Sequence, residues 1–207
     1  MSRLICPVCE RALKGCLCPL IQKIDNRIEL GILQHPTEVS QVKGTAKLAQ
    51  LSLSACRFWI GEEADQLDDF MVWLNSGEAV FLLYPSIENQ LESFQSFSIP
   101  QIQREFSSDN IKVLILDGTW RKTHKMMMLS RELRGLNRII LEPKQQSNYQ
   151  IRKQKNVMSL STVEAIYETY AQLEGSAEKF KPLITAFEQM QSQQLAYRNK
   201  PTTSQEQ

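Results

Sequence analysis

The chain has 207 residues, enough for a single domain that buries most of its apolar surface without disulfides or metals. Hydrophobic residues make up 42% and charged residues 23%, which is ordinary for a globular protein, and the net charge of +1 excludes a uniformly basic nucleic-acid coat. No apolar run is long enough to cross a bilayer, and the first residues lack the apolar core of a signal peptide. We therefore expect a cytoplasmic protein with no membrane partner, whose cysteines stay reduced or bind metal.

Four of the five cysteines lie near the start of the chain with the spacing C-x2-C-x6-C-x-C. Four thiolates this close suit tetrahedral zinc, and a closed four-cysteine site would be structural because it leaves no open coordination position. We predict a zinc knuckle whose ligands are Cys6, Cys9, Cys16 and Cys18; the alternative is four unrelated free cysteines. Nearby Arg3, Arg11 and Lys14 fit either phosphate contacts to RNA or an ordinary solvated surface.

Beyond this head, short apolar runs alternate with segments of helical periodicity, which predicts an α/β fold with a mainly parallel sheet flanked by helices. The expected strands are residues 28–33, 57–60, 79–83, 111–116 and 138–141. The expected helices are residues 45–54, 65–74, 121–129, 161–173 and 176–197. The polar stretch 87–109 is predicted to be a long loop. We divide the chain into a Cys-rich head (1–25), an α/β domain (26–198) and a disordered tail (199–207).

Polar residues directly follow three of the predicted strands, at the ends where open α/β sheets bind their ligands. These residues are His35 to Glu38, Tyr84 with Pro85, and Asp117-Gly118-Thr119-Trp120. Asp117 or Thr119 could instead simply cap the following helix, and a lone histidine such as His35 is more often structural than catalytic. Farther along, Ser161 or Thr162 with Glu164 predicts a helix cap, and such a helix start can also bind an anion.

Taken together, these motifs resemble the DTW-domain family over residues 6 to about 170. The sequence departs from the usual pattern at Ile151, where Leu is common, and at Lys155, near where Pro is often found. The matching motifs are the cysteine head, His35-Pro36-x-Glu38, Leu83-Tyr84-Pro85, Asp117-x-Thr119-Trp120, Tyr149-x-Ile151-Arg152 and Leu160-Ser161-Thr162-x-Glu164-Ala165. The resemblance implies a tRNA-uridine aminocarboxypropyltransferase related to the SPOUT superfamily, whose C-terminal trefoil knot holds S-adenosylmethionine. Periodicity by itself indicates only the parallel sheet.

The implied reaction moves the 3-amino-3-carboxypropyl group of S-adenosylmethionine to N3 of a tRNA uridine and releases methylthioadenosine. We expect Asp117 to accept the N3 proton and Trp120 to stack on a base, although Trp120 could also be a core residue. Arg152 could hold the carboxylate of the cofactor or an RNA phosphate, and His35 and Glu38 could shape the site or orient the target base. The catalytic residues that the resemblance implies are Asp117, Thr119, Trp120, His35 and Glu38. The expected cofactor-binding residues are Leu83, Tyr84, Pro85, Asp117, Gly118, Tyr149, Arg152, Leu160, Ser161, Thr162 and Glu164.

Two other classes of protein fit the same motifs. One is a SPOUT-type RNA methyltransferase, which would present the methyl carbon of the same cofactor. The other is a non-catalytic zinc-knuckle protein that binds RNA. The sequence does not identify the tRNA, the uridine position or the oligomeric state, and it is compatible with a monomer.

Overall fold

The computed structural model describes residues 4–39, 41, 44–84, 94–141 and 160–198. Over these residues, six strands form one all-parallel sheet in the order β2-β1-β5-β3-β6-β4. The strands are β1 (Glu29–Gln34), β2 (Cys56–Ile60), β3 (Ala79–Leu83), β4 (Ser96–Ser98), β5 (Ile111–Asp117) and β6 (Asn137–Ile140). β5 is buried along its whole length, as a central strand covered on both faces must be.

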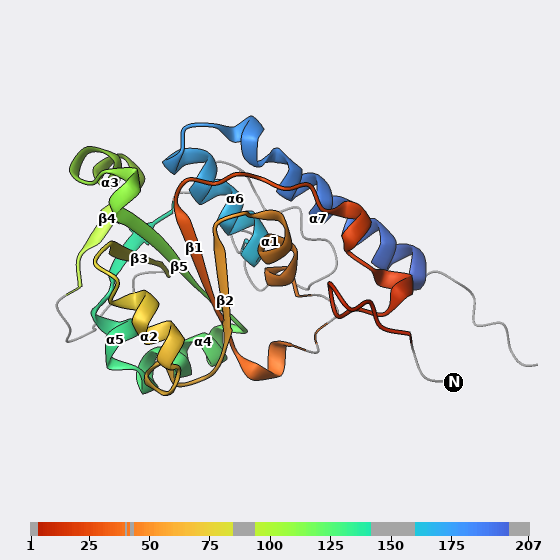
Figure 1. Ribbon diagram of the computed structural model, residues 1–207, viewed down its shortest axis with the longest axis horizontal. Coiled ribbons are helices and arrows are strands. Elements are labelled where there is room, and N and C mark those ends of the chain that lie inside the picture. Colours follow the sequence, from red (N-terminus) through yellow and green to blue (C-terminus); the bar gives the residue numbers. More distant parts are fainter. Residues whose placement is uncertain (1–3, 40, 42–43, 85–93, 142–159, 199–207) are drawn as a thin grey trace, which may run out of the picture.

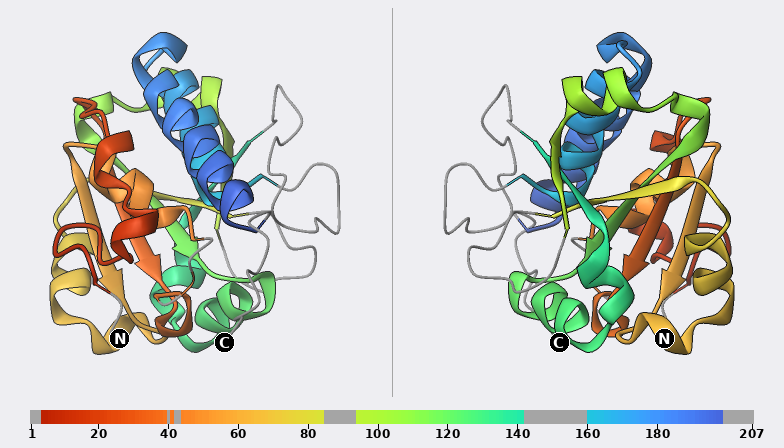
Figure 2. Two further views of the ribbon diagram at one scale, coloured as in Figure 1. Left: turned by 90° about the vertical axis from the view of Figure 1, so that its right-hand side faces the viewer. Right: turned by 90° about the vertical axis from the view of Figure 1, so that its left-hand side faces the viewer.

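Helices cover both faces of the sheet, and each face has its own apolar cluster (Figures 1 and 2). Alternate residues of β5 serve the two clusters, with Val113 and Ile115 on one side and Leu114 and Leu116 on the other. The first face carries α1 (Ala46–Ser52), α3 (Ile99–Glu105), α6 (Thr162–Leu173) and α7 (Ala177–Arg198). The second carries α2 (Asp68–Leu74), α4 (Trp120–Leu129) and α5 (Arg131–Gly135). Short 3-10 helices are η1 (Leu13–Gly15), η2 (Cys18–Leu20), η3 (Pro36–Glu38), η4 (Ala64–Gln66) and η5 (Ser108–Asn110).

The N-terminal segment lies against α7 (Figure 1). Its residues Cys6, Cys9 and Leu17 belong to the same apolar cluster as α6, α7 and the sheet. Arg11 also reaches across to the loop before α1, where its guanidinium donates to the carbonyl of Gly44 at 2.6 Å. The cysteine head is therefore packed onto the body of the protein.

The sequence predictions of strands are confirmed, with each end displaced by at most one residue. The prediction of a long loop at 87–109 is wrong, because its described part contains β4, α3 and the start of η5. Among the described residues of this segment, 94–109, only Phe97, Ile99 and Ile102 are buried, which is too few to give a clear period. The helix is fixed instead by a capping box between Ser98 and Gln101 and by a proline in its first turn.

The short helix α5 was also not predicted. No helix among the described residues is both long enough and apolar enough to span a membrane. The path of a knot would include residues 142–159, which lie outside the described residues. The described residues therefore establish the all-parallel sheet, and the knot stays a prediction.

Candidate active site

The carboxyl ends of β1 and β5 form a topological switch point. The two strands are neighbours, but the chain leaves β1 toward α1 on one face of the sheet and leaves β5 toward α4 on the other. In open parallel sheets such a divergence opens a crevice that binds ligands. Gln34 and Asp117, the last residues of the two strands, are paired in register at this point.

Asp117 is buried here, and two side chains hold its carboxylate. The amide nitrogen of Gln34 donates to Oδ2 at 2.8 Å, and the hydroxyl of Thr162 donates to Oδ1 at 2.7 Å. Gln34 comes from β1 and Thr162 from the first turn of α6, so the carboxylate joins three elements that are distant in the sequence. A carboxylate fixed in this way is aimed before any substrate arrives, which is what catalysis by a positioned base requires.

His35 directly follows Gln34, and its backbone N–H donates to the carbonyl oxygen of Asp117 at 2.9 Å. Its Nδ1 accepts the backbone N–H of Thr37, so in the neutral ring the proton is on Nε2, which donates to Glu62 at 2.8 Å. The ammonium of Lys125, 2.9 Å away, and the hydrogen bond from His35 both lower the pKa of Glu62. Both ring nitrogens of His35 thus have protein partners, and the ring anchors the loop after β1.

Glu38 and Gly118 bring this loop against the start of α4. The carboxylate of Glu38 forms an ion pair with Lys122 at 2.7 Å. A Cβ atom added to Gly118 would lie 3.3 Å from side-chain atoms of both Lys122 and Thr123. The backbone of Gly118 is not in the left-handed region, so close packing, and not a special turn conformation, is the reason for glycine here.

Trp120 opens α4 and stacks on Tyr84 at the end of β3. The ring centroids are 5.2 Å apart and the planes differ by 11°. Tyr84 is buried, whereas Trp120 is 56% exposed, so the alternative that Trp120 is a core residue is wrong. The guanidinium of the fully buried Arg138 lies 5.8 Å from the centre of the Tyr84 ring. The Trp120 ring is therefore exposed to solvent, and the buried side chains of Tyr84 and Arg138 lie behind it.

The hydroxyl of Tyr84 is a second feature of this part of the site. Burial raises the pKa of Tyr84, so its hydroxyl stays protonated. This hydroxyl is buried and makes no hydrogen bond of good geometry to the described residues, although the Thr123 side chain lies near enough to oppose the rise in its pKa. A buried polar atom of this kind can serve a bound ligand.

The start of α6 confirms the predicted cap. Ser161 is the N-cap, its hydroxyl accepts the N–H of Glu164, and the Glu164 carboxylate accepts the N–H of Ser161 at 2.7 Å. The backbone N–H of Val163, the second residue of α6, donates to the hydroxyl of Thr45. The side chains of Ser161 and Glu164 are thus used within the cap, while Thr162 is directed to Asp117.

The structure brings together most of the predicted site residues. Thr119 is the N-cap residue of α4 but makes no side-chain cap bond, and Leu83 and Leu160 are half-buried. Pro85, Tyr149 and Arg152 lie outside the described residues.

Sequence reasoning missed three residues of the site: Gln34, Glu62 and Arg138. Gln34 and Glu62 follow the same strand-end rule as His35, because Gln34 ends β1 and Glu62 comes two residues after β2. Their positions alone could have suggested them. Arg138 was hidden within an apolar run, where a charged side chain is itself a signal.

The four clustered cysteines meet a geometric test for a metal site. The sulfur atoms of Cys6 and Cys18 are 3.7 Å apart, those of Cys9 and Cys16 are 3.6 Å apart, and all four lie within 4.8 Å of one another. A zinc tetrathiolate with bonds of about 2.3 Å has sulfurs about 3.8 Å apart. The cluster could therefore hold a metal ion.

The knuckle also supplies donors to its sulfurs. Backbone N–H groups of Cys9 and Val8 lower the pKa of Cys6 to about 6, while burial raises the pKa of Cys18 to about 12. Four thiolates so close would repel one another without a cation between them. The donor set thus fits a bound metal better than four free thiols.

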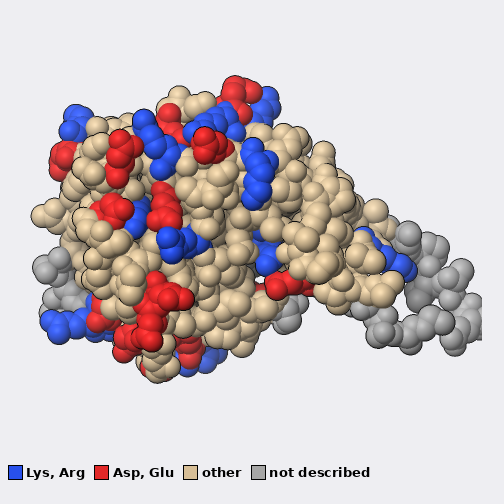
Figure 3. Space-filling view, viewed as in Figure 1, with Lys and Arg blue, Asp and Glu red and all other residues tan. Residues whose placement is uncertain are grey.

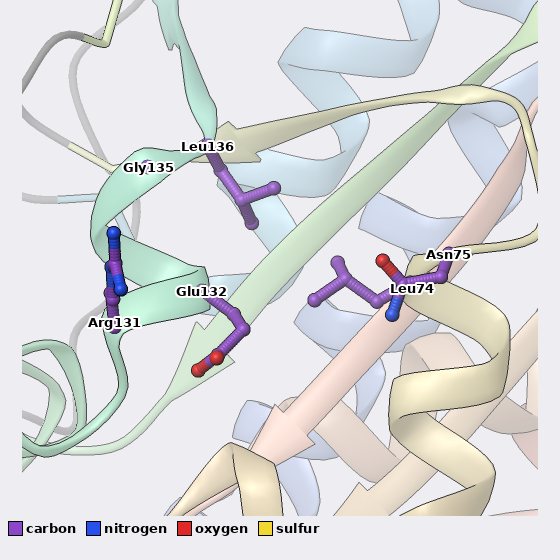
Figure 4. Close-up of a pocket in the computed structure, with 6 residues that line it drawn as sticks. All are labelled: Leu74, Asn75, Arg131, Glu132, Gly135 and Leu136. Atoms are coloured by element: carbon purple, nitrogen blue, oxygen red, sulfur yellow. The ribbon is translucent and has the colours of Figure 1, made fainter.

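A pocket of about 390 Å³ lies elsewhere, between α2 and α5. Figure 4 shows Leu74 on α2 and Leu136 after α5 pointing toward one another across it. Its other lining residues are Asn75, Arg131, Glu132 and Gly135. None of the residues at the switch point lines it.

The sequence of this chain is similar to those of known proteins over most of its length. Proteins named tRNA-uridine aminocarboxypropyltransferase 2 from Drosophila melanogaster and Macaca fascicularis are each 28% identical to this chain, over 186 and 200 residues. The matches cover 86% and 93% of this chain and 70% and 64% of those proteins. The protein of the same name from Mus musculus is 29% identical over 167 residues, covering 77% of this chain and 53% of its own length. No solved structure matches. The model of the DTW domain matches residues 3–195, and the chain therefore belongs to the DTW domain family.

Proposed function

We propose that this protein is an S-adenosylmethionine-dependent tRNA-uridine aminocarboxypropyltransferase. The observation that carries the proposal is the buried carboxylate of Asp117 at the switch point, held by Gln34 and Thr162. The names of its relatives support the reaction class and tRNA as the substrate.

The reaction joins N3 of a uridine to the Cγ methylene of the aminocarboxypropyl group. The N3–H bond breaks, N3 attacks Cγ, and the Cγ–S bond breaks so that its electrons leave with methylthioadenosine. S-adenosylmethionine supplies the activated carbon, because its sulfonium makes the neighbouring methylene electrophilic. Asp117 accepts the N3 proton, a step that a positioned general base typically accelerates by about 10²- to 10⁴-fold.

Other residues orient the two substrates. The open face of Trp120 suits a uracil ring. The half-buried Leu83 and Leu160 offer apolar contact to an adenine, and the buried hydroxyl of Tyr84 offers a donor. Arg152, outside the described residues, stays our prediction for the carboxylate of the cofactor. We assign zinc to the cysteine cluster as a structural metal, and a SPOUT-like C-terminal knot remains part of the proposal.

Mass spectrometry of tRNA nucleosides tests the proposal in cells. We expect 3-(3-amino-3-carboxypropyl)uridine to be lost from tRNA in cells that lack this protein. The wild-type gene should restore it, and a gene encoding Asp117→Asn should restore little of it. An unchanged set of tRNA nucleosides would contradict the proposal, and a missing methylated nucleoside would favour a methyltransferase.

A further inference from the structure

Helix α4 presents an unusual face to solvent. Thr123, Met126 and Met127 bury its inner side against the sheet. Its outer side combines large apolar and basic side chains at helical spacing: Trp120, Arg121, His124, Lys125 and Met128. Trp120 is 56% exposed and Met128 is 42% exposed, whereas side chains of this size and apolarity are usually buried.

The charge of this face has one sign. Between Asp117 and Glu132 the chain carries four lysine and arginine residues and no acidic residue. Lys122 and Lys125 are balanced by ion pairs with residues of neighbouring loops. Arg121, and Arg131 at the start of α5, are exposed and have no ion-pair partner among the described residues. The start of α4 and the start of α5 thus each carry one exposed arginine whose charge is not balanced by an ion pair among the described residues.

Acidic residues gather elsewhere. Figure 3 shows acidic side chains over α2 and the segment before it, where Asp65, Asp68 and Asp69 are exposed. The near-zero net charge of the chain thus hides a separation of charge between neighbouring helices of the same layer. A polyanion would be directed away from α2 and toward α4.

We propose that this outer face of α4, continued by Arg131, is the surface on which the substrate RNA docks. The proposal rests on the function proposed above, since it takes tRNA as the substrate. A nucleobase stacks on the open side of Trp120, and phosphates of flanking nucleotides lie along Arg121 and Arg131. Both contacts suit single-stranded RNA, because every base has a face that can stack and arginine binds phosphate in a fork geometry.

The position of the face ties docking to the reaction. Trp120 lies only three residues after Asp117, and its ring is held flat against Tyr84. A base stacked on this ring therefore lies at the start of the helix that directly follows the switch point. Arg131, at the start of α5, then sets the direction in which the strand leaves the site.

Binding of unmodified tRNA to the full chain, measured over a range of salt concentrations, tests the proposal without any chemistry. We expect the double variant Arg121→Ala/Arg131→Ala to bind more weakly. A plot of the logarithm of the binding constant against the logarithm of the salt concentration should be less steep for this variant. The magnitude of its slope should decrease by about 1.5, because the variant loses two phosphate contacts and each contributes about 0.7–0.9. Trp120→Ala should weaken binding by about 5- to 150-fold with an unchanged slope, because indole carries no charge.

A matched double variant, Arg27→Ala/Lys181→Ala, provides the control. Arg27 lies before the amino end of β1 and Lys181 lies on α7, and both side chains are exposed. This variant should keep the affinity and slope of the wild type. If the α4 variant and the control bind alike, the docking surface is wrong while the proposed function stands. If the wild type does not bind tRNA at all, the proposed function itself fails.

Discussion

Replacing Asp117 by asparagine should remove the proton acceptor at the switch point and leave the stability of the fold almost unchanged. The carboxylate accepts one hydrogen bond from Gln34 and one from Thr162. Asparagine has the same shape and can accept one of the two through its carbonyl oxygen. Its NH2 group then faces the other partner, and the hydroxyl of Thr162 can turn to accept from it. Both contacts survive, so the free energy of unfolding should fall by less than about 1 kcal/mol.

Alanine at the same position should behave differently. It removes both acceptors and leaves the amide of Gln34, which is buried, without a partner. An unsatisfied buried donor costs about 1–3 kcal/mol, and we expect Asp117→Ala to lose that much stability. Asp117→Asn and Asp117→Ala should both lose the base and therefore about 10²- to 10⁴-fold in rate.

Single-turnover modification of unmodified tRNA and urea unfolding measure the two effects separately. A variant Asp117→Asn that reacts within a few-fold of the wild type would refute the assignment of Asp117 as the proton acceptor. It would leave membership of the family untouched. A loss of stability well above about 1 kcal/mol in Asp117→Asn would instead contradict the expectation that asparagine keeps the hydrogen bonds to Gln34 and Thr162.

Three further predictions concern other parts of the molecule. Elemental analysis should find about one zinc per chain, Cys9→Ser should lose it and unfold at a lower temperature, and metal-free protein of full stability would exclude a structural metal. Gly31→Ala should destabilise the fold by about 1–3 kcal/mol in urea unfolding. The reason is that its Cβ would lie 2.4 Å from the ring of Trp73. Unchanged stability would show that this ring can move aside without loss of free energy. Arg152→Ala should weaken binding of S-adenosylmethionine in calorimetry, and equal affinities would remove Arg152 from the cofactor site.

Strands β1, β3 and β5 could be predicted because each contains a short, continuous apolar run that is buried over most of its length. The site was found in part for the same reason, since His35 and Asp117 directly follow such runs. What the sequence could not provide was the order of the strands. Gln34 and Asp117 meet only because β1 and β5 are neighbours in the sheet. That pairing joins residues 83 positions apart, and no local pattern encodes it.

The segment with β4 and α3 shows a different limit. Its few buried residues are separated by polar ones, because the segment lies at the edge of the sheet and only part of it is covered. Trp120 shows the reverse case. An aromatic residue at the start of a helix is as consistent with the core as with the surface, and only the three-dimensional structure places it outside.

The by-product of the reaction tests the central claim most directly. Purified protein would be incubated with S-adenosylmethionine and unmodified tRNA, and the small molecules released would be identified by mass spectrometry. Aminocarboxypropyl transfer predicts methylthioadenosine in an amount equal to the modified uridine. Release of S-adenosylhomocysteine together with a methylated nucleoside would contradict the account.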